Sequence, residues 1–475
     1  MITTSKTGSL TRYLQVVILI ICFSANKTEA SPRVFPTGVT IYNPAKAHNS
    51  FVVFGSPDGK SHLIDMNGNE VRQWPYIGFP SEILDPNVTN GKLGHILVQL
   101  KNGEGVWSGI FNNKIIGELD WDGNIVWQYG KETPGNEARQ NHDWNRLPNG
   151  NTLIVRTVDH VVPAVSIKPI DDQTINEITP DGKIVWSWNA GEHLAEFGIT
   201  AEGISLLQKY YADGSHGHGF LTINDMQPIG SNKWFEAGDS RFDPENIVID
   251  SREASFIAII EKKSGKIVWR VGPDFSAETQ SSGGGPNFSK AALRPTLSTK
   301  IPRPVDQISG QHDAHIIPKG LPGAGNLLVF DNEGPSGYPS TRLSTQNGSR
   351  ILEINPVTKE IVWQYSALDS NQPVWDFYSS FISSARRLPN GNTLIDEGMN
   401  GRIFQVTKAG EIAWEYVSPY FTNAPLGGTQ TIYTNWVFRA QPVPYEWIPK
   451  ETPHTEIAVE EIDISKFRVP VKTLH

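Results

Sequence analysis

Two histidines three residues apart stand out in the stretch SGQHDAHIIPKGLPGAGNLLVFDN, which begins at Ser309. Imidazole serves as a nucleophile, a general acid or base, or a metal ligand near neutral pH. His312 and His315 could therefore be a metal pair, an acid–base pair, or a nucleophile and a bystander. Residues i and i+3 of a β-strand point to opposite faces. We therefore expect one histidine to be functional and the other to be packed.

A proline before a glycine turn recurs in four stretches and gives a common register. The residues six positions before Pro148, Pro228, Pro318 and Pro389 are His142, Thr222, His312 and Ser383. His142 and His312 therefore share a position, and each is followed by aspartate. This register selects His312 as the functional member of its stretch and predicts that His315 faces the sheet packing.

Charged and amide side chains stand at the ends of the second strands of the repeats. Asp250 and Arg252 end one such strand, and Asp331 with Asn332 ends another. Aspartate and asparagine at these positions are also ordinary turn residues. Arg252 is different, because a guanidinium presents a planar set of donors to an oxyanion.

The elements that position these residues come from a repeat. An apolar strand ending in an aromatic residue follows a glycine or similar turn six times, at 62–74, 117–129, 176–188, 258–270, 352–365 and 404–416. A second turn-and-strand phrase precedes most of these. Two hairpins in each of six units predict an all-β fold, a six-bladed β-propeller. A β-sandwich pair or a solenoid is the alternative. The first strand of each blade lines the channel, where the register positions should converge.

The ends and insertions complete the predicted organisation. Residues 435–444 resemble the start of a blade, so we expect this C-terminal segment to complete the first blade and close the ring. The propeller is predicted over 31–450, followed by a tail over 451–475. Insertions interrupt it near 189–215, which reads as helical, and near 273–308, which is rich in Gly, Ser and Pro.

Residues 1–30 have the layout of a signal peptide. Lys6 and Arg12 precede a short apolar run over 14–23, and Ala30 marks the expected cleavage point. Cys22, the single cysteine, lies in this segment, so the mature chain is expected to lack disulfides and thiol chemistry. A lipoprotein signal ending at Cys22 fits less well. We expect a secreted or periplasmic protein without a membrane span. Its net charge of −9 argues against nucleic-acid binding.

Read together, these phrases resemble the arylsulfotransferase family from residue 36 to 449. The most specific stretches are GQHDAHIIPKGLPGAGNLLVFDN, the segment GDSRFDPENIVIDSREASFIAIIEKKSGKIVWRVGPD and SSARRLPNGNTLIDEGMNGRIFQVTKAGEIAWEYVSPYF. The resemblance implies a secreted or periplasmic six-bladed propeller. Bacterial members of the family move a sulfuryl group between phenols through a sulfated histidine. The substrate would be a small aromatic or sulfated molecule, and this chemistry needs no metal or other cofactor.

The chain departs from the family pattern in its fourth blade. A W-x-H-x-N-S motif reads FLTIND here, so Thr222 replaces the histidine while Asn224 is kept. No histidine lies between His315 and His454. Two readings follow. Either His312 is the nucleophile, with His142 as acid and Arg252 holding the sulfate, or the protein is a non-catalytic secreted propeller that binds an anionic or aromatic ligand or a protein partner.

The remaining candidates are expected to contact substrate rather than to react. They are Asn224, Thr222, His315, Asn332 and Ser383. A quinone-cofactor dehydrogenase shares tryptophan-bearing repeats with this chain. That class would require more blades and a clear metal site, and the sequence indicates neither.

Overall fold

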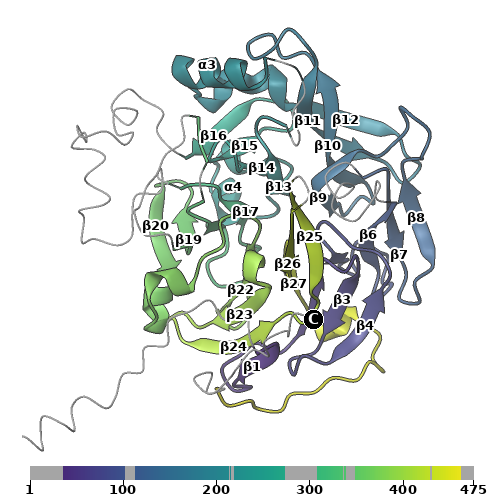
Figure 1. Cartoon of the computed structure of the whole chain (residues 1–475), viewed down its shortest axis with the longest axis vertical. Coiled ribbons are helices and arrows are strands. Elements are labelled where there is room, and N and C mark those ends of the chain that lie inside the picture. Colours follow the sequence, from purple (N-terminus) through teal and green to yellow (C-terminus); the bar gives the residue numbers. More distant parts are fainter. Residues whose placement is uncertain are drawn as a thin grey trace, which may run out of the picture.

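Six antiparallel sheets surround a central axis in the computed structural model (Figure 1). The structure describes residues 36–101, 113–212, 214, 219–272, 308–334, 336–338, 348–427 and 430–461. Within these ranges the chain is a six-bladed β-propeller, as the repeats predict. The predicted signal peptide and nearly all of the 273–308 insertion lie outside the described residues.

Each blade is a four-stranded meander whose first strand is innermost. Blade 1 consists of β27 (Ala440–Val443), β2 (Phe51–Gly55), β3 (Ser61–Ile64) and β4 (Glu70–Trp74). Blade 2 consists of β5 (Glu82–Ile83), β6 (Ile96–Lys101), β7 (Ile115–Leu119) and β8 (Ile125–Tyr129). Blade 3 consists of β9 (Gln140–Arg146), β10 (Thr152–His160), β11 (Ile170–Ile178) and β12 (Ile184–Asn189).

Blades 4 to 6 repeat the arrangement, and the last gains a fifth strand. Blade 4 consists of β13 (Ile223–Pro228), β14 (Ile247–Ser251), β15 (Phe256–Ile260) and β16 (Ile267–Val271). Blade 5 consists of β17 (His312–Ile316), β18 (Leu327–Asp331), β19 (Arg350–Asn355) and β20 (Glu360–Tyr365). Blade 6 consists of β21 (Ser384–Arg387), β22 (Thr393–Glu397), β23 (Arg402–Val406), β24 (Ile412–Val417) and β1 (Gly38–Tyr42).

Both ends of the chain close the ring. The C-terminal strand β27 pairs with β2, Phe51 opposite Val443, and so supplies the inner strand of blade 1. The N-terminal strand β1 pairs with β24 on the outside of blade 6. The predicted C-terminal closing segment is therefore confirmed. Closure leaves the inner edge of blade 1 paired, which protects it from pairing with another chain.

The tryptophan of the repeated phrase joins neighbouring blades. In five blades its indole N–H donates to a carbonyl in the outer turn of the next blade, which both satisfies the buried donor and fixes the spacing of the blades. These bonds are Trp127 to Pro180 (3.1 Å), Trp186 to Lys262 (2.9 Å), Trp269 to Pro356 (2.7 Å), Trp363 to Lys408 (3.0 Å) and Trp414 to Met66 (2.7 Å). In blade 1 the same place holds Arg72, whose guanidinium lies over the ring of Trp121.

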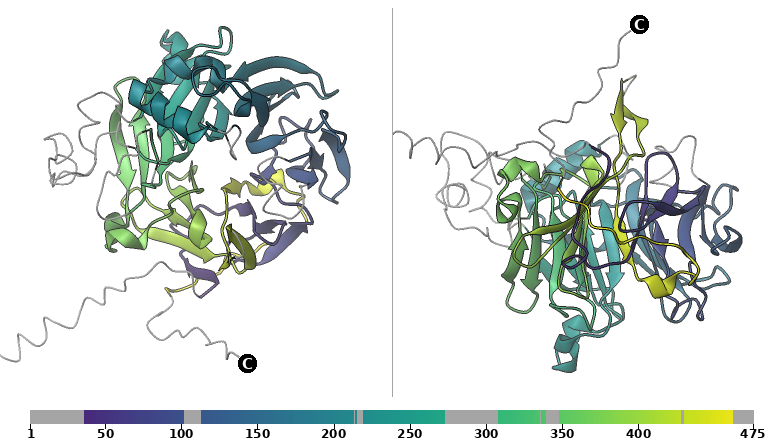
Figure 2. Two further views of the ribbon diagram at one scale, coloured as in Figure 1. Left: turned by 45° about the horizontal axis from the view of Figure 1, so that its top comes forward. Right: turned by 90° about the horizontal axis from the view of Figure 1, so that it is seen from below.

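The insertions are short helices and one projecting hairpin. The 189–215 insertion contains η1 (Ala190–Phe197) and α3 (Ala201–Tyr210), as its sequence predicts. The other helices are α4 (Lys233–Glu236), η2 (Ser240–Phe242), η4 (Ala367–Ser370), η5 (Val374–Asp376), η6 (Gly398–Asn400) and η7 (Tyr445–Trp447). The hairpin of β25 (Thr422–Gly427) and β26 (Gln430–Thr434) rises clear of the blades in the side view of Figure 2. Among the described helices, none has the length and apolar character that crossing a membrane requires.

Candidate functional site

The inner strands bring the predicted positions to the same level of the channel, with one correction. Pro148, Pro318 and Pro389 each follow the residue that opens the turn, but Pro228 still lies in β13 and pairs with Ile247. Counting back from Pro228 therefore overshoots by two residues. The prediction that Thr222 shares the histidine position is wrong, and Asn224 holds it. The four equivalent residues are His142, Asn224, His312 and Ser383.

His312 is held at both ring nitrogens. Its Nδ1 lies 2.7 Å from Asn332 Oδ1 and 3.0 Å from the carbonyl oxygen of Gly310. The backbone N–H of Ile382 donates to its Nε2 at 3.0 Å. A carbonyl accepts only and a backbone N–H donates only, so Nδ1 carries the proton and Nε2 carries the lone pair. The ring is a neutral imidazole of defined tautomer.

The surroundings of His312 oppose its protonation. The side chain is 3% exposed. Burial, together with the positive charge of Arg252, lowers the pKa of His312 to about 3. Arg252 follows β14, where its backbone N–H donates to Thr222 and its guanidinium pairs with Glu253. The imidazole therefore stays in its neutral form, with a proton on Nδ1 only, over the whole neutral pH range.

His142 stands against an apolar cluster. Its ring centroid lies 5.6 Å from that of Phe79 and 6.1 Å from that of Phe438, and Nδ1 contacts Asn141 Oδ1. The cluster consists of Ile77, Phe79, Ile382, Trp436 and Phe438, with Met399 packed against it. Ile382 also supplies the N–H on His312. The two histidines, from blades 3 and 5, therefore border one aromatic-rich cluster.

The other predicted site residues lie near this cluster or in the framework. Ser383 accepts the N–H of Gly398 and donates its own backbone N–H to Phe438. His315 is buried, its Nδ1 faces the carbonyl oxygen of Asp313, and burial lowers its pKa to about 4. Asn224 Nδ2 donates to the carbonyl oxygen of Gln311, and Thr222 Oγ1 to that of Gly219. In the described geometry these side chains bind the protein's own backbone.

A buried charge cluster lies beneath the histidines. Arg439, the residue before β27, pairs with Asp143 (3.0 Å), Asp225 (2.9 Å) and Asp313 (3.1 Å). These aspartates follow the equivalent positions in blades 3, 4 and 5, and their side chains are fully buried. Asp143 and Asp313 also accept backbone N–H groups of the next blade. We call these four residues the axial cluster.

More acids than bases gather around the axial cluster. Burial raises the pKa of Asp225 well above its usual range, while Arg439 lowers it. The same two effects act on the pKa values of Asp250 and Asp396. Burial raises the pKa of Glu82 to about 7. Arg439 pairs with all three aspartates of the axial cluster, and Arg386 also pairs with Asp313, so Arg439 contributes most of the ion pairs that balance their buried negative charge.

Sequence reasoning missed the axial cluster. The aspartate after each of the two histidines was visible, but Arg439 comes from the closing segment, far away in sequence. The described residues bring no three His, Cys, Asp or Glu side chains together in a way that could hold a metal ion.

Comparison with known proteins places the chain in a family. Residues 64–422, well over half of the chain, match the model of the arylsulfotransferase (ASST) family. The chain belongs to the arylsulfotransferase family. No curated protein matches it.

Solved structures similar to this arylsulfotransferase family member include a protein of unknown function from Bacteroides caccae, 12% identical, with a TM-score of 0.43 over 83% of this chain and 99% of that one. Another is a catalytically inactive virginiamycin B lyase from Staphylococcus aureus with quinupristin, 13% identical, with a TM-score of 0.36 over 82% and 92% of the two chains. Likeness at this level carries no functional argument.

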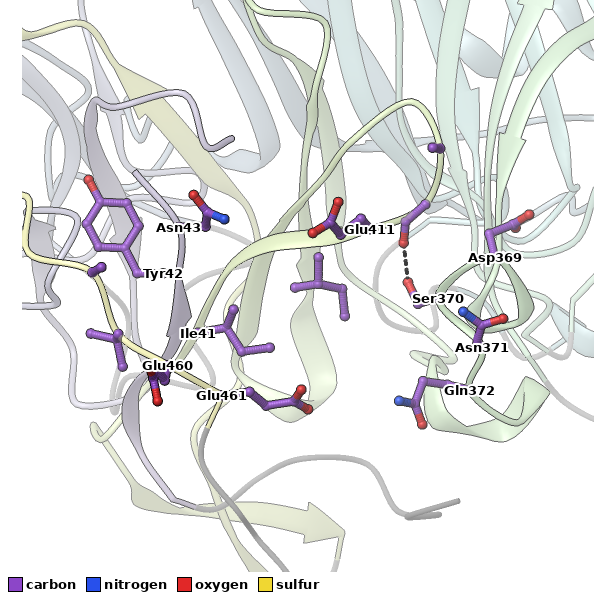
Figure 3. A pocket seen from close by; sticks show the side chains of 15 residues that line it. Ile41, Tyr42, Asn43, Asp369, Ser370, Asn371, Gln372, Glu411, Glu460 and Glu461 are labelled. Atoms are coloured by element: carbon purple, nitrogen blue, oxygen red, sulfur yellow. Dashed lines mark hydrogen bonds between the residues drawn. The ribbon is translucent and has the colours of Figure 1, made fainter. Parts of the chain in front are cut away.

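A cavity of about 610 Å³ lies beside β1 on the outside of blade 6, and no histidine is among the described residues that line it (Figure 3). It is bordered by β1, by residues 369–372 and by the C-terminal segment over 458–461. Its labelled side chains are largely acidic or amide groups, including Glu411, Glu460 and Glu461. An acidic lining repels sulfate esters, so we do not assign the family's chemistry to this cavity.

Proposed function

We propose that this protein transfers a sulfuryl group from an aryl sulfate to a phenolic acceptor, with His312 as the nucleophile. The observation that carries the proposal is the fixed neutral tautomer of His312. An imidazole whose Nδ1 proton is held by Asn332 and Gly310 presents the lone pair of Nε2 to an electrophile. It reacts without first losing a proton.

Arg252 is the proposed anion-binding group. It follows β14 in blade 4, the neighbour of the blade that carries His312, and its positive charge lowers the pKa of His312. A guanidinium beside the nucleophile would bind the sulfate oxygens and stabilise the charge that they carry in the transition state. Glu253 pairs with Arg252 in the described state, so substrate sulfate has to compete with that carboxylate.

His142 is the proposed acid for the departing phenolate. In the first step the bond between Nε2 and sulfur forms, the bond between sulfur and the aryl oxygen breaks, and the phenolate leaves with the electron pair. Protonated His142 would give that oxygen a proton. In the second step the acceptor phenol loses its proton to neutral His142, and its oxygen attacks sulfur. The bonding pair then returns to Nε2.

The backbone around Ile382 has to move during this reaction. Its N–H lies on the nitrogen that the mechanism requires, 3.0 Å away. Ile382 and Ser383 both have positive φ, 54° and 97°, which a β-branched residue rarely adopts. Strain of this kind stores free energy that a movement of the segment releases. We call residues 379–382 the cap.

A transfer assay tests the proposal. The purified protein is mixed with para-nitrophenyl sulfate and a phenol, and release of nitrophenolate is compared with formation of the sulfated acceptor. We expect transfer that His312→Ala abolishes and that His454→Gln, an exposed histidine, leaves unchanged. Absence of transfer across several donors and acceptors would favour a non-catalytic propeller that binds an anionic or aromatic ligand. The segment over 1–30 leads us to place the activity outside the cytoplasm.

A further inference from the structure

Asn332 connects His312 with the cap. It directly follows β18 and is completely buried. Its Nδ2 donates to the carbonyl oxygens of Ser379 (2.7 Å) and Ile382 (2.8 Å), while its Oδ1 faces His312 Nδ1. One amide group therefore contacts both the histidine and both ends of the cap.

The orientation of this amide is determined by its partners. Two carbonyl oxygens only accept hydrogen bonds, so they require the NH2 side of Asn332, and Oδ1 must then face His312. Oδ1 only accepts, so Nδ1 of the histidine must donate. The Ile382 N–H imposes the same tautomer from the opposite side of the ring. The Gly310 carbonyl oxygen, 3.0 Å from Nδ1, accepts from the same N–H, so three partners specify the Nδ1–H form of His312.

We propose that Asn332 is a positioning residue that holds His312 in the tautomer required for sulfuryl transfer, an inference that rests on the proposed function. Throughout the reaction the proton stays on Nδ1. When Nε2 bonds to sulfur, the ring gains positive charge and its Nδ1–H bond to Asn332 strengthens. A neutral amide accepts this bond without adding an anion. The sulfur–nitrogen bond then remains reactive toward the acceptor phenol.

Nitrogen NMR of the whole protein, labelled at histidine, tests the tautomer without an activity readout. The His312 signals are identified by their loss in His312→Gln. We expect a protonated Nδ1 and an unprotonated Nε2 throughout the neutral range. Asn332→Leu removes the side-chain acceptor on Nδ1 and also the two bonds that hold the cap, and with it the Ile382 N–H, against the ring. It should therefore populate the Nε2–H form, although the Gly310 carbonyl still faces Nδ1. Ser349→Ala is the matched control, because Ser349 bonds the cap at Ser379 and the Asn332 backbone but does not touch the ring.

Two outcomes would overturn the proposal. One is a His312 ring with its proton on Nε2 in the unmodified protein. The other is an unchanged tautomer in Asn332→Leu, provided that its overall spectrum remains that of the folded protein. If Asn332→Leu does not fold, Asn332→Asp serves instead. Its carboxylate keeps the acceptor but adds an anion, so it should retain the Nδ1–H form and raise the pKa of His312 against the opposing charges of Arg252 and Arg439.

Kinetics separate this inference from the proposed function. Histidine enzymes whose ring is held in the wrong tautomer lose on the order of 10⁴-fold in turnover, so Asn332→Leu should reduce transfer far more than Ser349→Ala does. Asn332→Asp should add an acidic limb to the pH profile that the unmodified protein lacks. If neither the unmodified protein nor any variant transfers sulfate, but the tautomer of His312 changes in Asn332→Leu, then Asn332 positions His312 and the proposed function is wrong. If transfer occurs and the tautomer does not depend on Asn332, the positioning role is wrong.

Discussion

Replacing Arg439 with methionine tests whether one buried cation maintains the channel. The substitution keeps an unbranched apolar stem but removes a cation that pairs with Asp143, Asp225 and Asp313. Among the described residues, only Asp313 of these three keeps another cationic partner, Arg386. All three carboxylates are fully buried, so water cannot take the place of the guanidinium. The matched control is Arg241→Met, which removes a surface pair with Asp239 from a side chain that is 39% exposed.

The expected loss follows from the number and the burial of these pairs. Two unit charges about 4 Å apart attract by roughly 4 kcal/mol at the effective dielectric of a protein. Desolvation of the charges offsets much of that attraction, and removing one partner of a buried pair costs about 3–5 kcal/mol. We expect Arg439→Met to lose at least this much free energy of unfolding near neutral pH. The control should lose less than about 1 kcal/mol.

Acid should reduce the difference between Arg439→Met and the unmodified protein. Burial already raises the pKa values of Asp225, Asp250 and Asp396, and Arg439 opposes that rise. Without Arg439 the folded-state pKa values lie still further above the unfolded value of about 3.9. Such groups favour the folded state when protonated, and they cost stability as the pH rises above the unfolded pKa. The deficit of the variant should therefore shrink from about pH 7 to about pH 4.

Urea unfolding followed by the fluorescence of the 14 tryptophans measures both effects. A loss below about 1 kcal/mol near neutral pH, within the range of a surface pair, would refute the charge argument. So would a deficit that stays constant or grows as the pH falls.

Three further predictions concern single side chains. An alanine Cβ at Gly334 would lie 2.1 Å from the carbonyl oxygen of Ser380, so Gly334→Ala should displace the cap and speed release of nitrophenolate; an unchanged or slower release would contradict the cap's role. Trp269→Phe removes the bond to Pro356 and should cost about 1 kcal/mol in urea unfolding, while Trp375→Phe, at an exposed residue, should cost nothing measurable. His142→Gln should slow transfer from aryl sulfates of weakly acidic phenols more than from para-nitrophenyl sulfate, and equal slowing would exclude His142 as the acid.

The fold was predictable because its signal is repeated. Turns with alternating strands recur six times, five of them with glycine, and each repeat carries the same local information, so an error in one does not change the conclusion. The role of the repeated tryptophan was not predictable in the same way. Its N–H bonds to the next blade, for example from Trp414 to Met66, join residues that are distant in the sequence.

The candidate site was predictable only in part. The position shared by His142 and His312 follows from local register, and both lie on inner strands. The same register failed at Thr222, because Pro228 belongs to a strand rather than to a turn. Arg439 reaches the axis through closure of the ring, and the Ile382 N–H reaches His312 from the neighbouring blade. No local pattern encodes either long-range contact.

Detection of a sulfated His312 tests the central claim most directly. The protein is mixed with an aryl sulfate in the absence of acceptor, stopped at alkaline pH and digested, and the peptide that contains His312 is weighed by mass spectrometry. The account predicts one added sulfuryl group on this histidine, which disappears when a phenol is added before the stop. Transfer to the phenol without modification of His312, or modification of a different residue, would contradict it.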